Sequence, residues 1–241
     1  MSGRLLAAGG PVIPNFGKPN ACLKDNGWFC TFWIRHHWGD TLQPALIQHI
    51  QLTVIAVAIG FAISFPLAVI GYRFRPVDAP LGAFTDFLYT IPSIAFFLLL
   101  VPLTGVTVTT VEVALVSFTF FIFYRNIVVG LRSVPPEVLE SARGMGLTRR
   151  QTFFRVELPL ARPAIFAALR IATVATISIA TVAAFLIQDG LGAPIFDALY
   201  APDLFHTELL AAGGLAVLLA LTADFLLAGL QRAVTPWTRV R

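Results

Sequence analysis

Long runs of apolar residues recur along the chain and are separated by shorter polar stretches. The clearest run, residues 52–71, has no charged residue. A helix needs about 20 mostly apolar residues to cross a bilayer. These runs are too long for barrel strands and do not alternate between apolar and polar residues as such strands do. The pattern predicts five helical spans, at about residues 50–72, 84–103, 112–130, 160–187 and 208–230.

The composition agrees with this pattern. Hydrophobic residues make up 57% of the 241 residues and charged residues 12%, whereas a soluble domain has about 45–50% apolar and about 25% charged residues. These values exclude an ordinary soluble globule, a disordered chain, a collagen and a small disulfide scaffold. The predicted fold class is an all-α polytopic membrane protein.

Basic residues are distributed unequally between the two sides of the predicted membrane domain. Thirteen of the 17 Lys and Arg residues follow the first span, lie on or between the third and fourth, or follow the fifth. The opposite connections, 104–112 and 188–208, have no Lys or Arg but carry five acidic residues. Because positive loops stay on the cytoplasmic side, we expect the N-terminus outside and the C-terminus inside. The chain then divides into an external tail, 1–48, and a transmembrane domain, 49–237.

The external tail holds both cysteines of the chain, Cys22 and Cys30. Two cysteines eight residues apart on an oxidising face predict a disulfide; the alternative is two free thiols in an apolar stretch. Aromatic residues cluster beside them and favour the membrane interface: Trp28, Phe29, Phe32, Trp33 and Trp38. We expect residues 41–50 to form a short interfacial helix that leads into the first span.

The most informative polar segment is the loop 133–159. A pair of prolines begins a first short helix, and a glycine corner ends it. Thr148 and Gln151 form a capping-box pattern, which predicts a second helix at 149–157 that stops at Pro159. The loop is too polar to enter lipid and reads as a docking element for a cytoplasmic partner.

This loop resembles one in the permease subunits of ATP-binding-cassette importers, which has the form E-A-A-x3-G-x9-I-x-L-P. All seven positions fall in register, with Ser and Val as mild substitutions: Glu140, Ser141, Ala142, Gly146, Val156, Leu158 and Pro159. Residues 89–93, 130–134, 140–146 and 170–181 further resemble the osmoprotectant branch, and the match covers about 49–237. That branch imports glycine betaine, choline, carnitine or proline betaine. One departure is Asp189, with Gln188, ahead of a Gly-Leu-Gly segment where the branch has small residues.

The resemblance implies a five-span type I importer permease core whose loop 133–159, hereafter the coupling loop, docks on an ATPase subunit. The residues it assigns to this coupling are Glu140, Ser141, Ala142, Arg143, Gly146 and Leu147. Two simpler interpretations stay open. The arginines also satisfy the positive-inside rule, and Glu140 and Gly146 also suit helix capping.

The same resemblance implies the partners. The chain has no G-x-x-x-x-G-K-[ST] phosphate loop, so ATP and Mg are expected on two separate ATPase subunits, with no cofactor bound by this chain. A second permease subunit, identical or homologous, completes the pathway, and a separate external binding protein delivers the solute. We expect a multi-pass protein of the bacterial plasma membrane that contacts lipid and binds no nucleic acid.

Polar and kinked positions within spans are candidates for the translocation pathway: Tyr89, Pro92, Ser93, Thr173, Thr176 and Thr181. The alternative for the hydroxyls is hydrogen bonding between helices, which is common in membranes. Asp224 is an intramembrane acid, a type of residue that is often functional. We expect it to form a structural pair with a loop arginine, and Asp86 to lie similarly near the inner end of its span.

No catalytic or metal-binding constellation is visible in the sequence, so an enzyme is not predicted. The four histidines lie on the predicted outer side without metal-ligand spacing. His36 and His37 are expected to be surface histidines, and a weak metal site is the alternative for this pair. The predicted function is the permease subunit of an ATP-driven importer that forms half of the pathway for a compatible solute. The alternatives are a permease for methionine or polar amino acids and an ion-coupled secondary transporter using Asp224 and Asp86.

Overall fold

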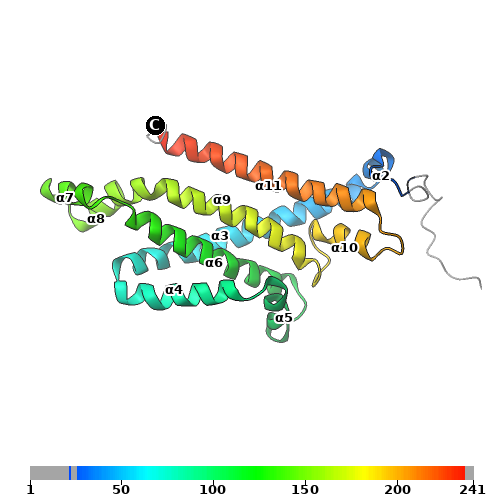
Figure 1. The fold of residues 1–241 in the computed structure, drawn as a ribbon, viewed down its shortest axis with the longest axis horizontal. Coiled ribbons are helices and arrows are strands. Elements are labelled where there is room, and N and C mark those ends of the chain that lie inside the picture. Colours follow the sequence, from blue (N-terminus) through cyan, green and yellow to red (C-terminus); the bar gives the residue numbers. More distant parts are fainter. Residues whose placement is uncertain (1–21, 23–25, 237–241) are drawn as a thin grey trace, which may run out of the picture.

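The structure is a computed structural model that describes residue 22 and residues 26–236. In this part of the chain all regular elements are helices, and the longer ones run roughly along one axis (Figure 1). In chain order they are α2 (Thr31–His36), the π-helical turn η1 (Trp38–Leu42), α3 (Gln43–Arg73), α4 (Arg75–Thr90), α5 (Ser93–Thr104), α6 (Val108–Arg132), α7 (Pro136–Gly144), α8 (Arg149–Thr152), the π-helical turn η2 (Phe153–Glu157), α9 (Leu158–Ala183), α10 (Gly192–Tyr200) and α11 (His206–Val234).

The two ends of the bundle are distinct. The coupling end comprises α7, α8 and η2 together with the last turns of α3 and α6 and the first turns of α4. The N-terminal end comprises residues 26–49 and 184–208, including α2 and α10 (Figure 1). The remainder of the predicted external tail, residues 1–21 and 23–25, lies outside the described residues, as do residues 237–241.

Four continuous helical segments of the described chain are long and apolar enough to cross a membrane: Trp38–Arg73, Val108–Arg132, Arg149–Ala183 and His206–Val234. Helices α4 and α5 together are also long and apolar enough, but they meet at an angle of 101°, so they add a fifth crossing only if the bent pair counts as one span. The polytopic all-helical architecture predicted from the sequence is confirmed.

At the predicted span 84–103, where Pro92 was expected to allow a bend, the chain breaks into two helices, α4 and α5. Ile91 takes an extended conformation, and Pro92 becomes the N-cap of α5. Proline disfavours the helical conformation in the residue before it and cannot donate a backbone hydrogen bond. The same Pro92 that the sequence placed inside a span therefore ends one helix and begins another.

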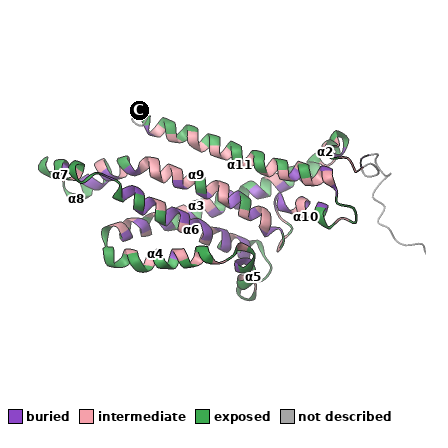
Figure 2. Ribbon diagram, in the orientation of Figure 1, coloured by how far each residue is buried: buried purple, intermediate pink, exposed green. Residues whose placement is uncertain are grey.

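Helix α6 is the centre of the bundle. It packs mainly against α3 on one side and α9 on the other, and 61% of its apolar window is buried, against 6% for α11. Figure 2 shows this contrast as a largely buried α6 and a largely exposed α11. Glycines allow the helices to approach closely. Gly130 of α6 lies against Ala164 of α9, and Gly60 of α3 lies against Thr119 of α6. Side chains around Phe123 and Ile127 fill the main core.

Helix α6 begins where its sequence offers a cap. The Thr107 hydroxyl accepts a hydrogen bond from the backbone N–H of Thr110 at 3.4 Å, which satisfies one of the free donors of the first turn. The capping box at the start of α8 is also present, with Thr148 and Gln151 each bonding the other's backbone N–H. Both helix starts follow directly from local sequence.

The second helix of the coupling loop does not stop at Pro159, contrary to the prediction. Residues 149–183 form one helical segment, in which η2 leads directly into α9. Pro159 occupies the first turn of α9, where a proline costs little, and the π-helical turn before it takes up the change in hydrogen bonding. The predicted separate interfacial helix at 41–50 is likewise absent, because η1 runs on into α3.

Candidate coupling surface and translocation elements

The coupling loop projects from one extremity of the bundle (Figure 1). Its first helix, α7, starts after Pro135 and ends in a tight corner, where the N–H of Leu147 donates to the Ala142 carbonyl at 3.1 Å. Gly146 has φ +80° in this corner, a backbone conformation that favours glycine. Sequence and structure therefore agree on the glycine corner and on its physical reason.

The residues assigned to coupling divide between two faces of this corner. Ala142 is buried and Leu147 is half-buried, whereas the other four are exposed: Glu140, Ser141, Arg143 and Gly146. Met145 at the tip is 72% exposed and was not singled out from the sequence. A surface with one flexible apolar tip beside charged groups suits docking to another protein.

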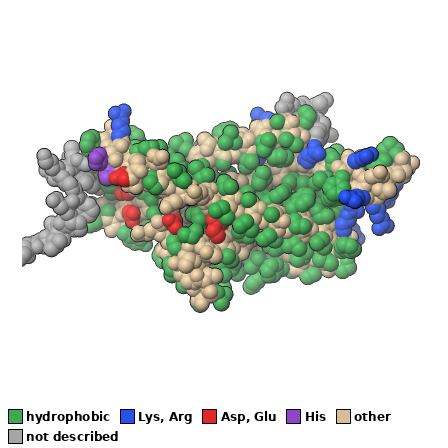
Figure 3. Space-filling model, turned by 180° about the vertical axis from the view of Figure 1, so that it is seen from behind, with side chains coloured by type: hydrophobic (Ala, Val, Ile, Leu, Met, Phe, Trp, Pro, Cys, Tyr) green, Lys and Arg blue, Asp and Glu red, His purple; other side chains and the backbone are tan. Residues whose placement is uncertain are grey.

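Charged residues are segregated along the molecule. Figure 3 shows Lys and Arg side chains gathered over the coupling end and acidic side chains mainly in the other half. Between these regions the visible surface is largely hydrophobic. This distribution is the one expected of a membrane protein whose coupling end lies in the cytoplasm.

A polar clamp holds α4 against α6 near the coupling end. The Tyr124 hydroxyl donates to Asp78 Oδ1 at 2.9 Å, and the Arg132 guanidinium donates to Asp78 Oδ2 at 2.9 Å. Gly71 of α3 faces the same Tyr124 hydroxyl and leaves room for it. Farther along the two helices Arg125 pairs with Asp86, with Nε 2.9 Å from Oδ1. Asp86 is thus a partner of an arginine in this structure.

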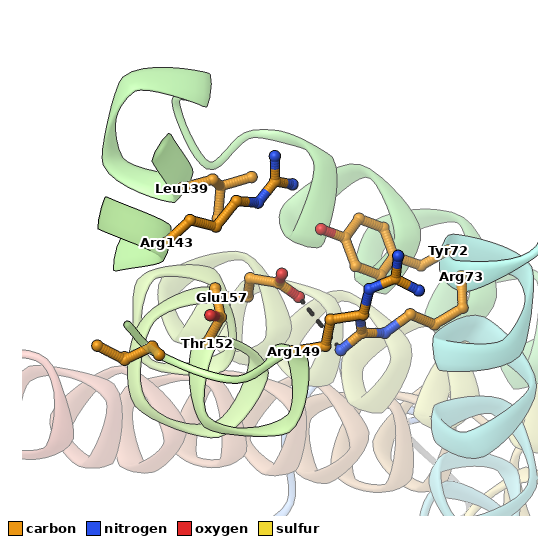
Figure 4. A pocket seen from close by; sticks show the side chains of 8 residues that line it. Tyr72, Arg73, Leu139, Arg143, Arg149, Thr152 and Glu157 are labelled. Atoms are coloured by element: carbon orange, nitrogen blue, oxygen red, sulfur yellow. Dashed lines mark ion pairs between the residues drawn. The ribbon is translucent and has the colours of Figure 1, made fainter. Parts of the chain in front are cut away.

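A cavity of about 670 Å³ lies between the end of α3 and the coupling loop (Figure 4). Arg73 and Glu157 face each other across it, with Nη2 3.8 Å from Oε2. The lining residues are Tyr72, Arg73, Leu139, Arg143, Leu147, Arg149, Thr152 and Glu157. Sequence reasoning missed Tyr72, Arg73 and Glu157. The available signal was one acid, Glu157, inside an otherwise basic and apolar stretch.

The three pathway candidates of the α4–α5 region lie at or beside the helix break. Tyr89 is exposed and stacks on Phe121, with ring centroids 4.2 Å apart. The carbonyl of Pro92 accepts from the N–H of Phe96, and Ser93 begins α5. A helix break of this kind exposes backbone polar groups, which membrane proteins tolerate where they line a cavity or are buried in protein.

The three threonines of α9 use their hydroxyls within their own helix. Thr173, Thr176 and Thr181 donate to the carbonyls of Leu169, Ala172 and Ile177, four residues earlier in each case. Thr176 is buried, while the other two are half-buried. Hydrogen bonding between helices, the alternative considered from the sequence, is therefore not what these hydroxyls do in this structure.

Asp224 forms a two-pronged ion pair with Arg170. The Arg170 Nε lies 2.7 Å from Oδ1 and its terminal nitrogen 2.8 Å from Oδ2, so the pair joins α11 to α9. The expected structural pair with an arginine is present, but the partner belongs to the fourth span and not to a loop, so that part of the expectation was wrong. The Arg170 side chain extends from α9 to α11, because two N–H groups of its guanidinium match the two oxygens of the Asp224 carboxylate.

His49, which the sequence placed on the outer side without a specific role, is fully buried at the N-terminal end. Its Nδ1 accepts the N–H of Leu191 at 3.2 Å, so its Nε2–H donates to the Ile177 carbonyl at 3.1 Å. The neighbouring Gly190 has φ +69° and lies against the ring. His49 thus ties α3 to α9 and to the Gly-Leu-Gly corner before α10, a role visible only once the chain is folded.

The described part of the N-terminal tail folds onto the loop before α11. Cys22 and Cys30 are joined in a disulfide, with Cα atoms 5.9 Å apart. The Asn26 amide donates to the Leu204 carbonyl at 2.8 Å, and the Trp28 ring lies 4.4 Å from the His206 ring. Within the described residues no group of three or more His, Cys, Asp or Glu side chains could hold a metal ion.

Comparison with known proteins agrees with this geometry. Residues 60–240 match the family described as "Binding-protein-dependent transport system inner membrane component". Two relatives come from Bacillus subtilis (strain 168). The choline transport system permease OpuBB is 35% identical over 82% of this chain and 90% of its own length. The glycine betaine/carnitine/choline permease OpuCB is 34% identical over the same shares.

A third relative is the osmoprotectant import permease OsmW of Salmonella typhimurium, 35% identical over 81% of this chain and 92% of its own. Among solved structures, the inward-facing MetNI methionine ABC transporter superposes with a TM-score of 0.74 at 24% identity, covering 83% of this chain and 98% of that one. An amino acid ABC transporter solved with histidines gives a TM-score of 0.70 at 19% identity, covering 85% and 99%. These two structures share the fold. The chain therefore belongs to the inner membrane components of binding-protein-dependent transport systems, the permease subunits of type I ABC importers, in the branch that contains the osmoprotectant and choline permeases.

Proposed function

We propose that this chain forms half of the translocation pathway for a compatible solute with a quaternary ammonium group, such as glycine betaine, choline or carnitine. The observation that carries the proposal is the exposed coupling corner at one extremity of a permease fold, together with relatives whose names specify these solutes. The chain belongs to a family of transport components, and its role here is to provide a path and a docking surface.

The partners follow from the same arrangement. Two ATPase subunits bind ATP and Mg and dock on the coupling end, where the basic residues gather. A second permease subunit, identical or homologous, supplies the other half of the path. A separate binding protein delivers the solute at the N-terminal end, which then faces outward in the plasma membrane of a bacterium, while the C-terminus lies inside.

Within the coupling corner the exposed residues Glu140, Ser141, Arg143 and Gly146 contact the ATPase. Ala142 and Leu147 hold the corner onto its base, since they are buried or half-buried. Small side chains at the corner allow close approach of the partner, and the φ of Gly146 keeps the turn tight.

Along the path, the α4–α5 break contributes Tyr89, Pro92 and Ser93, and α9 contributes Thr173 and Thr181. Thr176 is buried and supports the backbone of α9 from within. Aromatic faces attract quaternary ammonium groups. We therefore expect the exposed Tyr89 ring to contact the passing solute.

The test is reconstitution. A tagged version of this chain is purified from its native host to establish which ATPase and permease subunits accompany it. The complex is then placed in liposomes with the cognate binding protein, and uptake of labelled glycine betaine, choline, carnitine and methionine is measured.

ATP-dependent uptake of a quaternary ammonium solute without an ion gradient is the expected result. Uptake of methionine alone would assign the chain to the amino-acid alternative. Uptake driven by an ion gradient without an accompanying ATPase would overturn the importer assignment altogether.

A further inference from the structure

Glu157 is a charged residue in an unusually enclosed position. It ends η2, and its side chain is 7% exposed. Acids are almost never so buried without a partner, yet its Oε2 accepts no hydrogen bond from the described part of the chain. The nearest cation is Arg73, 3.8 Å away, and the Tyr72 hydroxyl points toward the carboxylate (Figure 4).

The residues that face Glu157 are the last two of α3. Arg73 also lies against Phe153, with the guanidinium carbon 5.0 Å from the ring centroid, a favourable cation–π distance. Phe153 begins η2 and Glu157 ends it. One arginine of α3 therefore contacts both ends of the same π-helical turn, and Phe153 itself is part of the main core.

This contact bridges elements that the backbone does not connect directly. The coupling loop is continuous with α6 on one side and with α9 on the other. The first span, α3, is distant from it in sequence, so movement of the loop reaches α3 only through packed side chains. The cavity of about 670 Å³ beside the pair leaves the loop room to move relative to α3.

We propose that Glu157 is a positioning residue that links the coupling loop to α3 through Arg73 and Tyr72, so that docking movements of the loop are passed to the first span. The proposal rests on the proposed function as an ATP-driven importer. Because the Glu157 side chain is enclosed, separating it from Arg73 would leave a buried carboxylate without its counter-charge, which is costly. Loss of the link weakens the transfer of movement to α3, while the packing of α3 against α6 and α9 remains.

The test compares Glu157→Gln with Asp86→Asn in the complete complex with its ATPase. Asp86 lies on α4, outside the coupling loop, and pairs with Arg125, so it controls for removal of one negative charge from an ion pair. In liposomes, Glu157→Gln should lower the solute transported per ATP hydrolysed about five- to tenfold, a coupling of the usual size for linked sites, while Asp86→Asn should not change it.

A charge-reversed double variant, Arg73→Glu with Glu157→Arg, should recover at least half of the lost coupling, because the cavity accommodates the longer guanidinium. Normal transport per ATP in Glu157→Gln would overturn the proposal. So would a loss that falls equally on ATP hydrolysis and transport and is not restored by the reversed pair, which would identify a merely structural residue.

A second readout requires no knowledge of the solute. Spin labels at Ile47, an exposed residue of α3, report the separation of the two permease subunits on addition of ATP. A change in the unmodified complex that is lost in Glu157→Gln supports the link, and an equal change in both contradicts it. This measurement still decides the matter if the solute proves not to be a quaternary ammonium compound.

Discussion

The coupling end and the N-terminal end of the bundle are held together by different chemistry. At the coupling end, long charged side chains join elements: Asp78 with Arg132 and Glu157 with Arg73. At the N-terminal end, the contacts are neutral hydrogen bonds to fixed backbone groups, centred on His49, together with a disulfide. Long side chains can follow a moving partner, whereas bonds between a buried ring and a glycine corner require one geometry. This difference predicts a docking end that tolerates movement, here called the mobile end, and an opposite end that holds one geometry, here called the rigid end.

The largest expected effect is at the rigid end. A Cβ at Gly192 would fall against the Thr181 carbonyl and 2.5 Å from the Cβ of Ala184. Gly192→Ala should destabilise the protein by about 3 kcal/mol, measured as thermal unfolding in detergent. Gly213→Ala is the matched control, because nothing lies near that position. Equal stability of the two variants would show that the corner is not rigid.

His49→Ala should cost about 2 to 3 kcal/mol, because it leaves the Leu191 N–H and the Ile177 carbonyl without the ring and opens a cavity. Since the ring bonds are neutral, this loss should be the same in low and high salt. The measurement is the unfolding midpoint of both proteins at two salt concentrations. A loss that shrinks with salt would contradict the neutral description of this end.

Asp78→Ala should cost about 2 kcal/mol, because both the Tyr124 hydroxyl and the Arg132 guanidinium lose their acceptor. Here the cost should fall in about 1 M salt, where charges are screened within about 3 Å. The comparison variant is Asp86→Ala, whose pair with Arg125 is more exposed and should be worth at most about 1 kcal/mol. The reverse order of the two variants would argue against the clamp.

Gly146→Val tests the mobile end through activity. The positive φ of Gly146 should make valine cost about 1 to 2 kcal/mol locally, and nothing surrounds the position to clash. We expect the variant to insert and to remain folded but to hydrolyse ATP without transport. Uptake per ATP at the level of the unmodified protein would contradict the assignment of this corner to coupling.

The smallest expected effect is that of replacing Cys22 and Cys30 by serine. The loop they close is short and contacts mainly the segment before α11, so we expect a cost of about 1 kcal/mol, at the low end for disulfides. Mass analysis with and without reductant should show no free thiol before reduction and two afterwards. Two alkylatable thiols without reductant would remove the disulfide from the description of the rigid end.

Much of the fold was predictable from the sequence because its signals are local. Apolar runs indicated the spans, the Thr148–Gln151 capping box and the glycine corner were both present as expected, and the coupling loop matched a family motif in register. Local signals also misled. Pro92 reads as a tolerated kink but divides α4 from α5, and Pro159 reads as a stop but sits in the first turn of α9. In each case the sequence showed that the proline lacks a backbone N–H and has a fixed φ. Whether the helix ends or begins at that proline depended on the conformation of the neighbouring turns.

The sequence by itself determined the order of the apolar segments, the basic coupling end, the first short helix of the coupling loop and the capping box that begins the second, since each depends on residues within a few positions of one another. Only the tertiary structure decided that Asp224 pairs with Arg170, that His49 is buried on the Gly-Leu-Gly corner and that Glu157 faces Arg73. These contacts join residues far apart in the chain. Their partners depend on how α6 draws α3 and α9 together, because side-chain polarity defines the kind of partner a residue requires and packing defines which one is within reach.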